Sequence, residues 1–319
     1  MSALQRGYLF GLAAYGLWGF VPLYFKLLEP SSPLEILAHR VVWSVLFLAL
    51  VLLVIRGWST LRGFAGQPLA VAGLTLAAIL IGLNWGTFIY GVATDRVVEA
   101  SLGYFINPLV TMLLGVLVLR ERLTPAQWTA LGVGAAAVTV LTIDHGRLPY
   151  IALILAGSFG CYGLLKKQLG LPAVSGLLVE SSILALPALG FLWWLSAQGE
   201  ATAGTAGVGH LILLLLAGAI TAVPLLFFAG AANRIPLTAL GILQYLAPTL
   251  QFLLGVLLFA EPMPPTRLAG FALVWLALAI FTADGLRRAR QRAAATAAQA
   301  KADAETVCTP EAPSADVQR

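Results

Sequence analysis

The sequence predicts an all-α integral membrane protein with ten transmembrane helices, arranged as two inverted five-helix repeats. Three observations predict this fold. Of the 319 residues, 60% are hydrophobic and 10% are charged, whereas soluble domains carry about 25% charged residues. The chain divides into ten apolar stretches near the ~20 residues that a helix needs to cross a bilayer. Its two halves also resemble each other, and because each contains five spans, the second must enter the membrane from the opposite side.

The predicted spans follow one another with short connections. The first contains Trp18 and Pro22 and has no small-residue cleavage site behind it, so we expect it to be retained rather than removed as a signal peptide. The spans at 126–143 and 149–165 are short. The ten spans are expected at residues 7–27, 34–55, 69–92, 97–119, 126–143, 149–165, 175–195, 208–230, 237–259 and 266–283.

Basic residues lie mainly on one side of these spans. With the N-terminus in the cytoplasm, twelve fall on inner loops and flanks and four on outer loops. The positive-inside rule therefore predicts that both termini are cytoplasmic. The inner residues are Arg6, Arg56, Arg62, Arg120, Arg122, Lys166, Lys167, Arg234, Arg287, Arg288, Arg290 and Arg292, and the outer ones are Lys26, Arg96, Arg147 and Arg267.

The repeat is clearest around the fourth and ninth spans. Residues 108–125 (PLVTMLLGVLVLRERLTP) align with residues 248–265 (PTLQFLLGVLLFAEPMPP) with matched proline, glycine and glutamate positions. Glu121 is flanked by arginines and Glu261 is not, as expected if the two copies face opposite sides. Both glutamates are expected to cap or anchor helix ends. The predicted domains are the first repeat at 1–145, the second at 146–285 and a disordered cytoplasmic tail at 286–319.

The net charge of +5 is mainly an orientation signal, and no nucleic-acid partner is expected. The sequence contains no spacing typical of a metal site, a nucleophile motif or a phosphate-binding loop, so neither a cofactor nor an enzymatic activity is expected. It leaves open whether the protein acts alone or as a homodimer. Four arginines at the start of the tail are expected to contact anionic lipids of the inner leaflet, at about 1 kcal/mol each. They are Arg287, Arg288, Arg290 and Arg292.

Polar side chains within the spans are candidates for a substrate pathway. Each proline in a span frees a backbone carbonyl, which at membrane depth must meet protein or water. Corresponding polar faces of the fourth and ninth spans therefore predict the walls of a central cavity, whereas packing between helices is the alternative, most of all for the third span. The candidates are Tyr104, Asn107 and Pro108 in the fourth span, Gln244, Tyr245 and Pro248 in the ninth, and Asn84 and Trp85 in the third.

Three ionisable residues, His39, Arg40 and Glu180, lie inside predicted spans. A charge at mid-span costs about 2.5–3.5 kcal/mol on insertion scales, so a functional role is expected. Arg40 aligns with Glu180 in the repeat. We expect Arg40 to bind an anionic group, Glu180 to carry an exchangeable proton and His39 to assist that transfer or to hydrogen-bond a neighbour. The alternative is a permanent ion pair, or an arginine that snorkels to the membrane surface.

Several segments resemble the EamA branch of the drug/metabolite transporter superfamily. They include YGLWGFVPLYFKLL at 15–28 and GVLVLRERLTPAQWTALGV at 115–133. EILAHRVVWS, LNWGTFIYGV, ASLGYFINPL and GILQYLAPTLQFLLGVL more narrowly resemble the RarD group of that branch. The resemblance covers about residues 5–285. It implies a ten-helix fold, a bacterial inner-membrane location and a secondary carrier of small metabolites or drugs, but it assigns no substrate.

The repeat and the polar residues together predict a secondary transporter. Two related halves that exchange shapes open one cavity to each side in turn, which is alternating access. Export is favoured over import, and proton coupling is left open. A membrane receptor or a lipid-translocating protein on the same fold is the alternative. Counterflow of labelled solutes across sealed vesicles would separate a carrier from a receptor.

Overall fold

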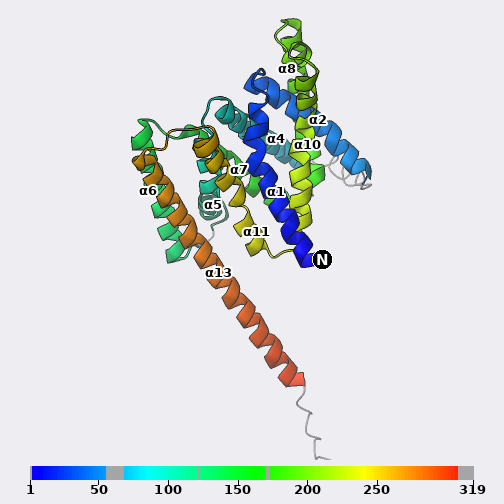
Figure 1. The fold of residues 1–319 in the computed structure, drawn as a ribbon. Coiled ribbons are helices and arrows are strands. Elements are labelled where there is room, and N and C mark those ends of the chain that lie inside the picture. Colours follow the sequence, from blue (N-terminus) through cyan, green and yellow to red (C-terminus); the bar gives the residue numbers. More distant parts are fainter. Residues whose placement is uncertain (1, 55–67, 121, 170–172, 308–319) are drawn as a thin grey trace, which may run out of the picture.

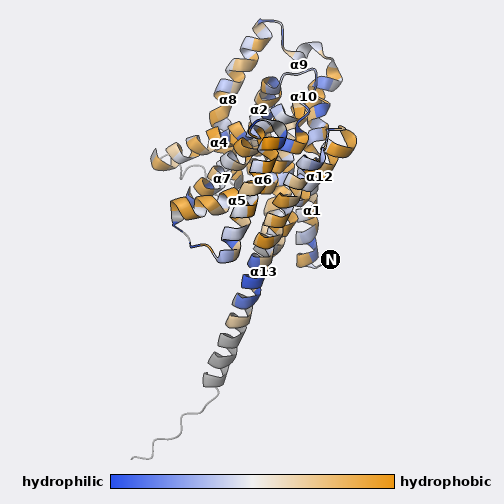
Figure 2. Cartoon of the chain, turned by 90° about the vertical axis from the view of Figure 1, so that its left-hand side faces the viewer, coloured by the Kyte–Doolittle hydropathy of each residue, from blue (hydrophilic) through white to orange (hydrophobic). Residues whose placement is uncertain are grey.

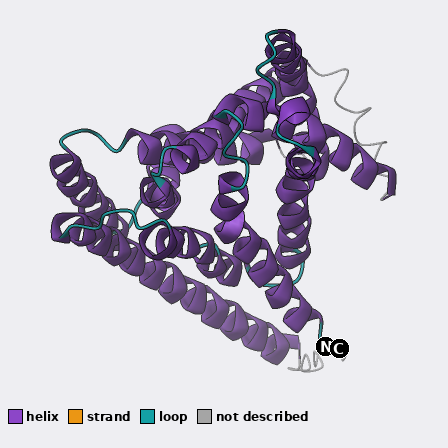
Figure 3. Ribbon diagram, turned by 45° about the horizontal axis from the view of Figure 1, so that its top comes forward, coloured by secondary structure: helices purple, strands orange, loops and turns teal. Residues whose placement is uncertain are grey.

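The computed structural model describes residues 2–54, 68–120, 122–169 and 173–307, and the elements in these ranges are helices joined by loops (Figure 3). Arg56, Arg62 and Glu121 lie outside the described residues, as do the side chains of Lys167 and Arg292. The elements are α1 (Ala3–Lys26), α2 (Pro33–Val54), α4 (Pro68–Ala93), α5 (Val97–Leu119), α6 (Pro125–His145), α7 (Tyr150–Leu169), α8 (Ala173–Ala197), α9 (Thr202–Thr205), α10 (Val208–Ala232), α11 (Leu237–Leu243), α12 (Leu246–Leu253), η1 (Leu254–Leu258) and α13 (Pro265–Val307).

Within the described residues, nine helical segments are long and apolar enough to cross a membrane, and α7 holds a shorter apolar stretch, Tyr150–Lys166. The helices are hydrophobic along much of their length (Figure 2). Large apolar side chains also point outward: Leu186 is 77% exposed and Trp193 is 75% exposed. Such a surface suits lipid rather than water. The predicted all-α membrane class is thus confirmed for the described chain.

The ninth predicted span is divided into α11, α12 and the π-helical turn η1. Pro248 lies in the first turn of α12. Proline has no backbone N–H, and its ring clashes with the carbonyl four residues earlier, which here belongs to Gln244. The break between α11 and α12 lies at Gln244 and Tyr245, next to this carbonyl. Pro108, by contrast, is accommodated inside an unbroken α5.

Most of the large contacts between helices occur twice, once in each of two equivalent pairs of helices. α1 packs against α10 and α12, while α7 packs against α4 and α5. α2 contacts α10, and α8 contacts α4. The remaining large contacts join α2 to α8 and α6 to α13, and the second of these pairs runs along one edge of the bundle (Figure 1). Under the predicted alignment of the halves, every one of these contacts has an equivalent in the other half or joins two equivalent helices.

The last helix, α13, continues past the bundle to Val307 (Figure 1). The sequence predicted disorder from residue 286, whereas the structure describes a helix over 286–307. This stretch contains no glycine or proline and is rich in alanine, arginine and glutamine, all good helix formers. Arg287 and Arg290 are exposed, and Arg288 pairs with Asp284 at 2.9 Å.

Candidate functional site

Arg40 lies on α2 in the interior of the bundle and is 9% exposed. Its Nε donates a hydrogen bond to Thr221 Oγ1 of α10 at 2.9 Å. Its guanidinium carbon lies 4.2 Å from the ring centroid of Trp85 on α4 and 5.6 Å from that of Phe25 on α1. Side chains from three other helices, α1, α4 and α10, therefore surround one cation. We call Arg40, Thr221, Trp85 and Phe25 the arginine cage.

The charge of Arg40 has no acidic partner in the described part of the chain. No carboxylate there lies within ion-pair distance of it, and no described residue accepts a hydrogen bond from its terminal nitrogens. The neighbours whose charge states interact with it are two tyrosines, Tyr104 and Tyr24. Burying an unpaired charge costs several kcal/mol, and a desolvated contact with a tryptophan face recovers about 2 kcal/mol. The cage thus holds a cation that is suited to receive an anionic group.

Tyr104 and Asn84 lie next to the cage in a hydrogen-bonded chain. The Tyr104 hydroxyl donates to Asn84 Oδ1 at 3.3 Å. The amide nitrogen of Asn84 donates to the Leu155 carbonyl at 3.0 Å and to Ser158 Oγ at 3.2 Å, both on α7. Asn84 therefore joins α4, α5 and α7. The contacts of Asn84 fit a role in packing between helices, whereas those of Trp85 fit a role in a binding site.

Glu180 is fully buried on α8 and has partners other than Arg40. Its Oε1 forms an ion pair with Lys166 Nζ at 2.7 Å, and its Oε2 accepts a hydrogen bond from the Tyr162 hydroxyl at 2.9 Å. Arg40 and Glu180 are thus not paired with each other. From the sequence, Lys166 was expected on an inner flank, and this pair was missed. The two residues lie 14 positions apart on neighbouring helices, and no local pattern pairs them.

The other predicted site residues are spread over several elements. His39 is buried, and its Nδ1 accepts a hydrogen bond from Trp43 Nε1 at 3.2 Å. Asn107 has a buried amide oxygen for which no described residue provides a hydrogen bond. The side chain of Tyr245 lies close to Thr282 of α13. α5 and α12, which carry Pro108 and Pro248, pack against each other, but Gln244 and Tyr245 have no described contact with the arginine cage.

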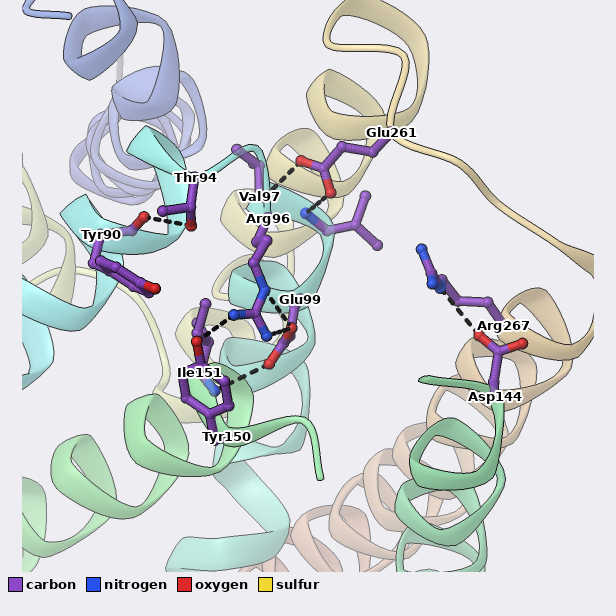
Figure 4. Close-up of polar contacts among 11 residues, drawn as sticks. Tyr90, Thr94, Arg96, Val97, Glu99, Asp144, Tyr150, Ile151, Glu261 and Arg267 are labelled. Atoms are coloured by element: carbon purple, nitrogen blue, oxygen red, sulfur yellow. Dashed lines mark hydrogen bonds and ion pairs between the residues drawn. The ribbon is translucent and has the colours of Figure 1, made fainter. Parts of the chain in front are cut away.

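On the predicted outer face, polar side chains connect the helix ends through hydrogen bonds and ion pairs (Figure 4). Glu261, in the loop before α13, accepts hydrogen bonds from the backbone N–H groups of Val97 at 2.6 Å and Val98 at 3.0 Å. Burial raises the pKa of the Glu261 carboxyl above its ordinary value, and these two hydrogen bonds oppose that rise. The predicted capping role is confirmed for Glu261, which caps the start of α5.

A second carboxylate repeats this arrangement at the start of α7. Glu99 Oε1 accepts a hydrogen bond from the Ile151 N–H at 3.0 Å. Glu99 also pairs with Arg96, which donates to the Tyr150 hydroxyl (Figure 4). We call Glu99, Arg96 and Glu261, together with the ion pair of Lys26 and Asp95 at 2.6 Å, the outer clamp. It joins the predicted halves, because Glu261 of the second binds α5 of the first, and Glu99 of the first binds α7 of the second.

Comparison with known proteins identifies close relatives of this chain. The model of the EamA-like transporter family matches residues 5–143. Protein RarD of Streptomyces exfoliatus is 53% identical over 287 residues, which cover 90% of this chain and 91% of that protein. The uncharacterized transporter YojE of Bacillus subtilis (strain 168) is 43% identical over 282 residues, 87% of this chain and 94% of that one. A solved crystal structure with 19% identity superposes with a TM-score of 0.56 over 87% of this chain and 97% of the other, and supports the fold alone.

Proposed function

Because the chain belongs to the RarD proteins of the EamA-like transporter family and is a membrane transporter, we propose that it moves a small metabolite or drug across the bacterial inner membrane by alternating access. Two inverted five-helix repeats would supply the two exchanging shapes. The paired helix contacts support this proposal, as does the family match at 5–143, which covers almost all of the first predicted repeat. We propose export as the direction, with both termini in the cytoplasm.

The observation that carries the proposal is the buried and unneutralised charge of Arg40. A cation held by a ring face and one hydroxyl keeps its two terminal nitrogens for a ligand, and arginine binds carboxylates and phosphates through such a fork. We therefore propose that the transported molecule carries a carboxylate or another anionic group. Trp85 would hold the guanidinium plane in place. Tyr104 would offer a hydroxyl beside it.

Counterflow in proteoliposomes tests this proposal without knowledge of the coupling ion. The purified full chain would be reconstituted and offered a panel of labelled small carboxylates and phosphates, each with an uncharged analogue. We expect exchange of at least one anionic probe. Loss of a charge-assisted hydrogen bond costs about 1.5–3 kcal/mol, so Arg40→Gln should weaken the apparent affinity by roughly 10- to 100-fold.

Arg234 provides a matched control. Its guanidinium carbon also lies over an aromatic ring, 5.4 Å from the Phe10 centroid. Unlike Arg40, however, Arg234 is exposed, in the turn that follows α10. Arg234→Gln should leave the exchange unchanged. Equal affinity in the Arg40→Gln variant, or exchange of uncharged probes alone, would refute the anionic-substrate proposal. Absence of any exchange would favour the alternative, a receptor or a lipid-translocating protein.

From the sequence, Glu180 was expected to carry an exchangeable proton. Its ion pair with Lys166 means that protonation of Glu180 would also release a lysine charge. Glu180→Gln tests this role. If transport driven by a pH gradient keeps its dependence on that gradient in the variant, Glu180 does not carry the coupled proton.

We also propose that the basic residues at the start of the tail bind lipid. Arg287 and Arg290 are exposed where α13 leaves the bundle, as contact with an anionic inner leaflet requires. Whether the transporter is a homodimer can be measured by its mass in lipid nanodiscs.

A further inference from the structure

A second buried polar cluster lies at the N-terminal ends of α2 and α10, apart from the arginine cage. It consists of Ser31 in the α1–α2 loop, Glu35 on α2, Thr202 on α9 and His210 on α10. Ser31 is 5% exposed, Glu35 is 1% exposed and His210 is 8% exposed. We call these four residues the relay cluster. Neither the sequence analysis nor the transport mechanism proposed above gives them a role.

Short hydrogen bonds connect the four side chains, and Thr202 Oγ1 also lies 3.1 Å from His210 Nε2, so that Ser31 and Thr202 both contact the imidazole. His210 Nε2 lies 2.7 Å from Ser31 Oγ. Ser31 Oγ lies 2.5 Å from Thr202 Oγ1, which lies 2.9 Å from Glu35 Oε1. The Thr202 backbone N–H also donates to Glu35 Oε1 at 2.7 Å. Every link is within ordinary hydrogen-bond length.

With His210 in the tautomer that carries its proton on Nε2, the proton inventory of these groups sets one direction along the chain. An ionised carboxylate only accepts, so the single hydroxyl proton of Thr202 is donated to Glu35. Ser31 must then donate its own proton to Thr202, because Thr202 has none left to give. His210 must in turn donate from Nε2 to Ser31. The result is a continuous path in which each donor faces an acceptor, from an imidazole at one end to a carboxylate at the other.

The charges around the cluster leave Glu35 without a fixed cation. No lysine or arginine in the described ranges forms an ion pair with it. The titratable group that faces the cluster from the same helix is His39, one turn from Glu35 and within electrostatic range of both Glu35 and His210. A buried carboxylate with no paired cation is expected to be neutralised by a proton when its surroundings change. The cluster therefore has the composition of a proton-binding site.

We propose that the relay cluster binds the coupling proton of the transporter and passes it between His210 and Glu35. A proton that binds His210 at Nδ1 forms the imidazolium. The Nε2 proton then moves to Ser31, the Ser31 proton to Thr202 and the Thr202 proton to Glu35. Three N–H or O–H bonds break and three O–H bonds form, which leaves neutral Glu35 and a neutral imidazole. This inference rests on the proposed transport function, for which it supplies the ion site.

The helices that carry the cluster also carry the arginine cage. α2 bears both Glu35 and Arg40, and α10 bears both His210 and Thr221. Beyond Arg40 on α2, the backbone of Trp43 packs directly on Gly218 of α10, so that a Cβ at position 218 would overlap that backbone. We expect loss of charge at Glu35 to act on the same two helices that hold Arg40, which would link proton binding to the substrate site.

Infrared titration of the full chain in lipid nanodiscs tests the proton site without a transport substrate. Neutral and ionised carboxyl groups absorb at different frequencies. We expect a carboxyl signal that depends on pH, and its loss in Glu35→Gln. Glu29→Gln, which changes an exposed carboxylate in the preceding loop, should keep the signal. A signal unchanged in Glu35→Gln would overturn the proposal.

A matched pair of threonines tests the relay itself. Thr202→Val removes the central hydroxyl and keeps the shape of the side chain, and should move the midpoint of the Glu35 signal by about one pH unit. Thr205 lies on the same short helix, but its hydroxyl bonds only to the Ala201 carbonyl. Thr205→Val should leave the midpoint in place. Thermal unfolding of each variant identifies any that fail to fold, and identical midpoints in Thr202→Val and wild type would exclude the relay.

Transport measurements separate this inference from the proposed function. We expect Glu35→Gln and His210→Gln to retain counterflow and to lose accumulation driven by a pH gradient. If the wild type shows no counterflow, the transport function is refuted while the titration still decides the proton site. If both variants accumulate probe as the wild type does, the relay cluster does not bind the coupled proton.

Discussion

Two buried charges, Arg40 and Glu180, are accommodated in different ways. Glu180 has a lysine and a tyrosine hydroxyl, which satisfy both of its oxygens. Arg40 has one hydroxyl and two ring faces, and its terminal nitrogens are not satisfied by the described residues. A satisfied ion pair stabilises one arrangement of helices, whereas an unsatisfied cation is available to a ligand. At the scale of residues, this difference separates a structural charge from a binding charge.

Disruption of the Glu180 pair should lower stability rather than change substrate affinity. Removing one partner of a buried pair costs about 3–5 kcal/mol, so we expect Glu180→Gln to unfold at clearly lower denaturant concentration in detergent. Lys166→Met combined with Glu180→Gln should recover part of this loss, because no unpaired charge remains. The four-variant cycle measures the coupling directly. Additive effects of the two substitutions would show that the pair contributes nothing.

At the scale of elements, the helix starts on the predicted outer face receive hydrogen-bond acceptors from side chains of other elements. The first N–H groups of a helix have no intrahelical acceptor and carry partial positive charge. Glu261 supplies both oxygens to the start of α5, and Glu99 supplies one to the start of α7. Each cap is also a contact between the predicted halves. The helix ends thereby hold the halves together at this face.

The Glu261 cap should make stability depend on pH. Its folded-state pKa is raised above the ordinary value of 4.5 by burial, so the folded protein binds this proton more readily than the unfolded chain. The resulting stabilisation is complete below the unfolded pKa and is lost as the pH rises through the folded pKa. We expect the difference in unfolding temperature between the wild type and Glu261→Gln to change between pH 4 and pH 7. The wild type should lose a few °C relative to the variant, which corresponds to a stability change of ~1 kcal/mol.

Glu200 is the control for this measurement, because it is exposed in a loop of the same face. Glu200→Gln should follow the wild type at every pH. A wild type and a Glu261→Gln variant whose unfolding temperatures run in parallel over the whole range would contradict the role assigned to the buried carboxyl.

At the scale of the whole molecule, the outer clamp closes one face of the bundle. Lys26 at the end of α1 pairs with Asp95 in the α4–α5 loop, and the two glutamate caps join the halves beside it. Such contacts must separate if the same protein opens to that face, as alternating access requires. Several of these charged residues also line a cavity of about 140 Å³, so there is free space beside the clamp.

A cross-link across the clamp should block transport reversibly. In a background without Cys161 and Cys308, we expect a short reducible thiol cross-linker to join Lys26→Cys to Asp95→Cys and to stop counterflow, with recovery on reduction. Lys26→Cys with Glu29→Cys is the matched control, because that pair lies within one turn and does not bridge two helices. Full exchange in the cross-linked Lys26–Asp95 variant would exclude opening at this face.

Much of the fold could be predicted because membrane helices are local features. Length and apolarity located the spans, since both depend on neighbouring residues alone. Proline by itself did not locate the breaks, because α5 continues through Pro108 whereas the ninth span is divided near Pro248. Glu261 was assigned to a helix cap from its place at a helix end. The missed contacts, Lys166 with Glu180 and Thr221 with Arg40, join residues 14 and 181 positions apart. Nothing in the local pattern specifies such partners.

The sequence by itself determined the class of protein, the positions of its helices, its family resemblance and the presence of charges inside the membrane. Only the tertiary structure decided which charges are neutralised. Helix formation in a bilayer is driven by local backbone hydrogen bonding and apolarity, which the sequence displays directly. The neutralisation of a buried charge depends instead on which helices pack together and how they are rotated. That is why Arg40 and Glu180, aligned in the repeat, have such different partners.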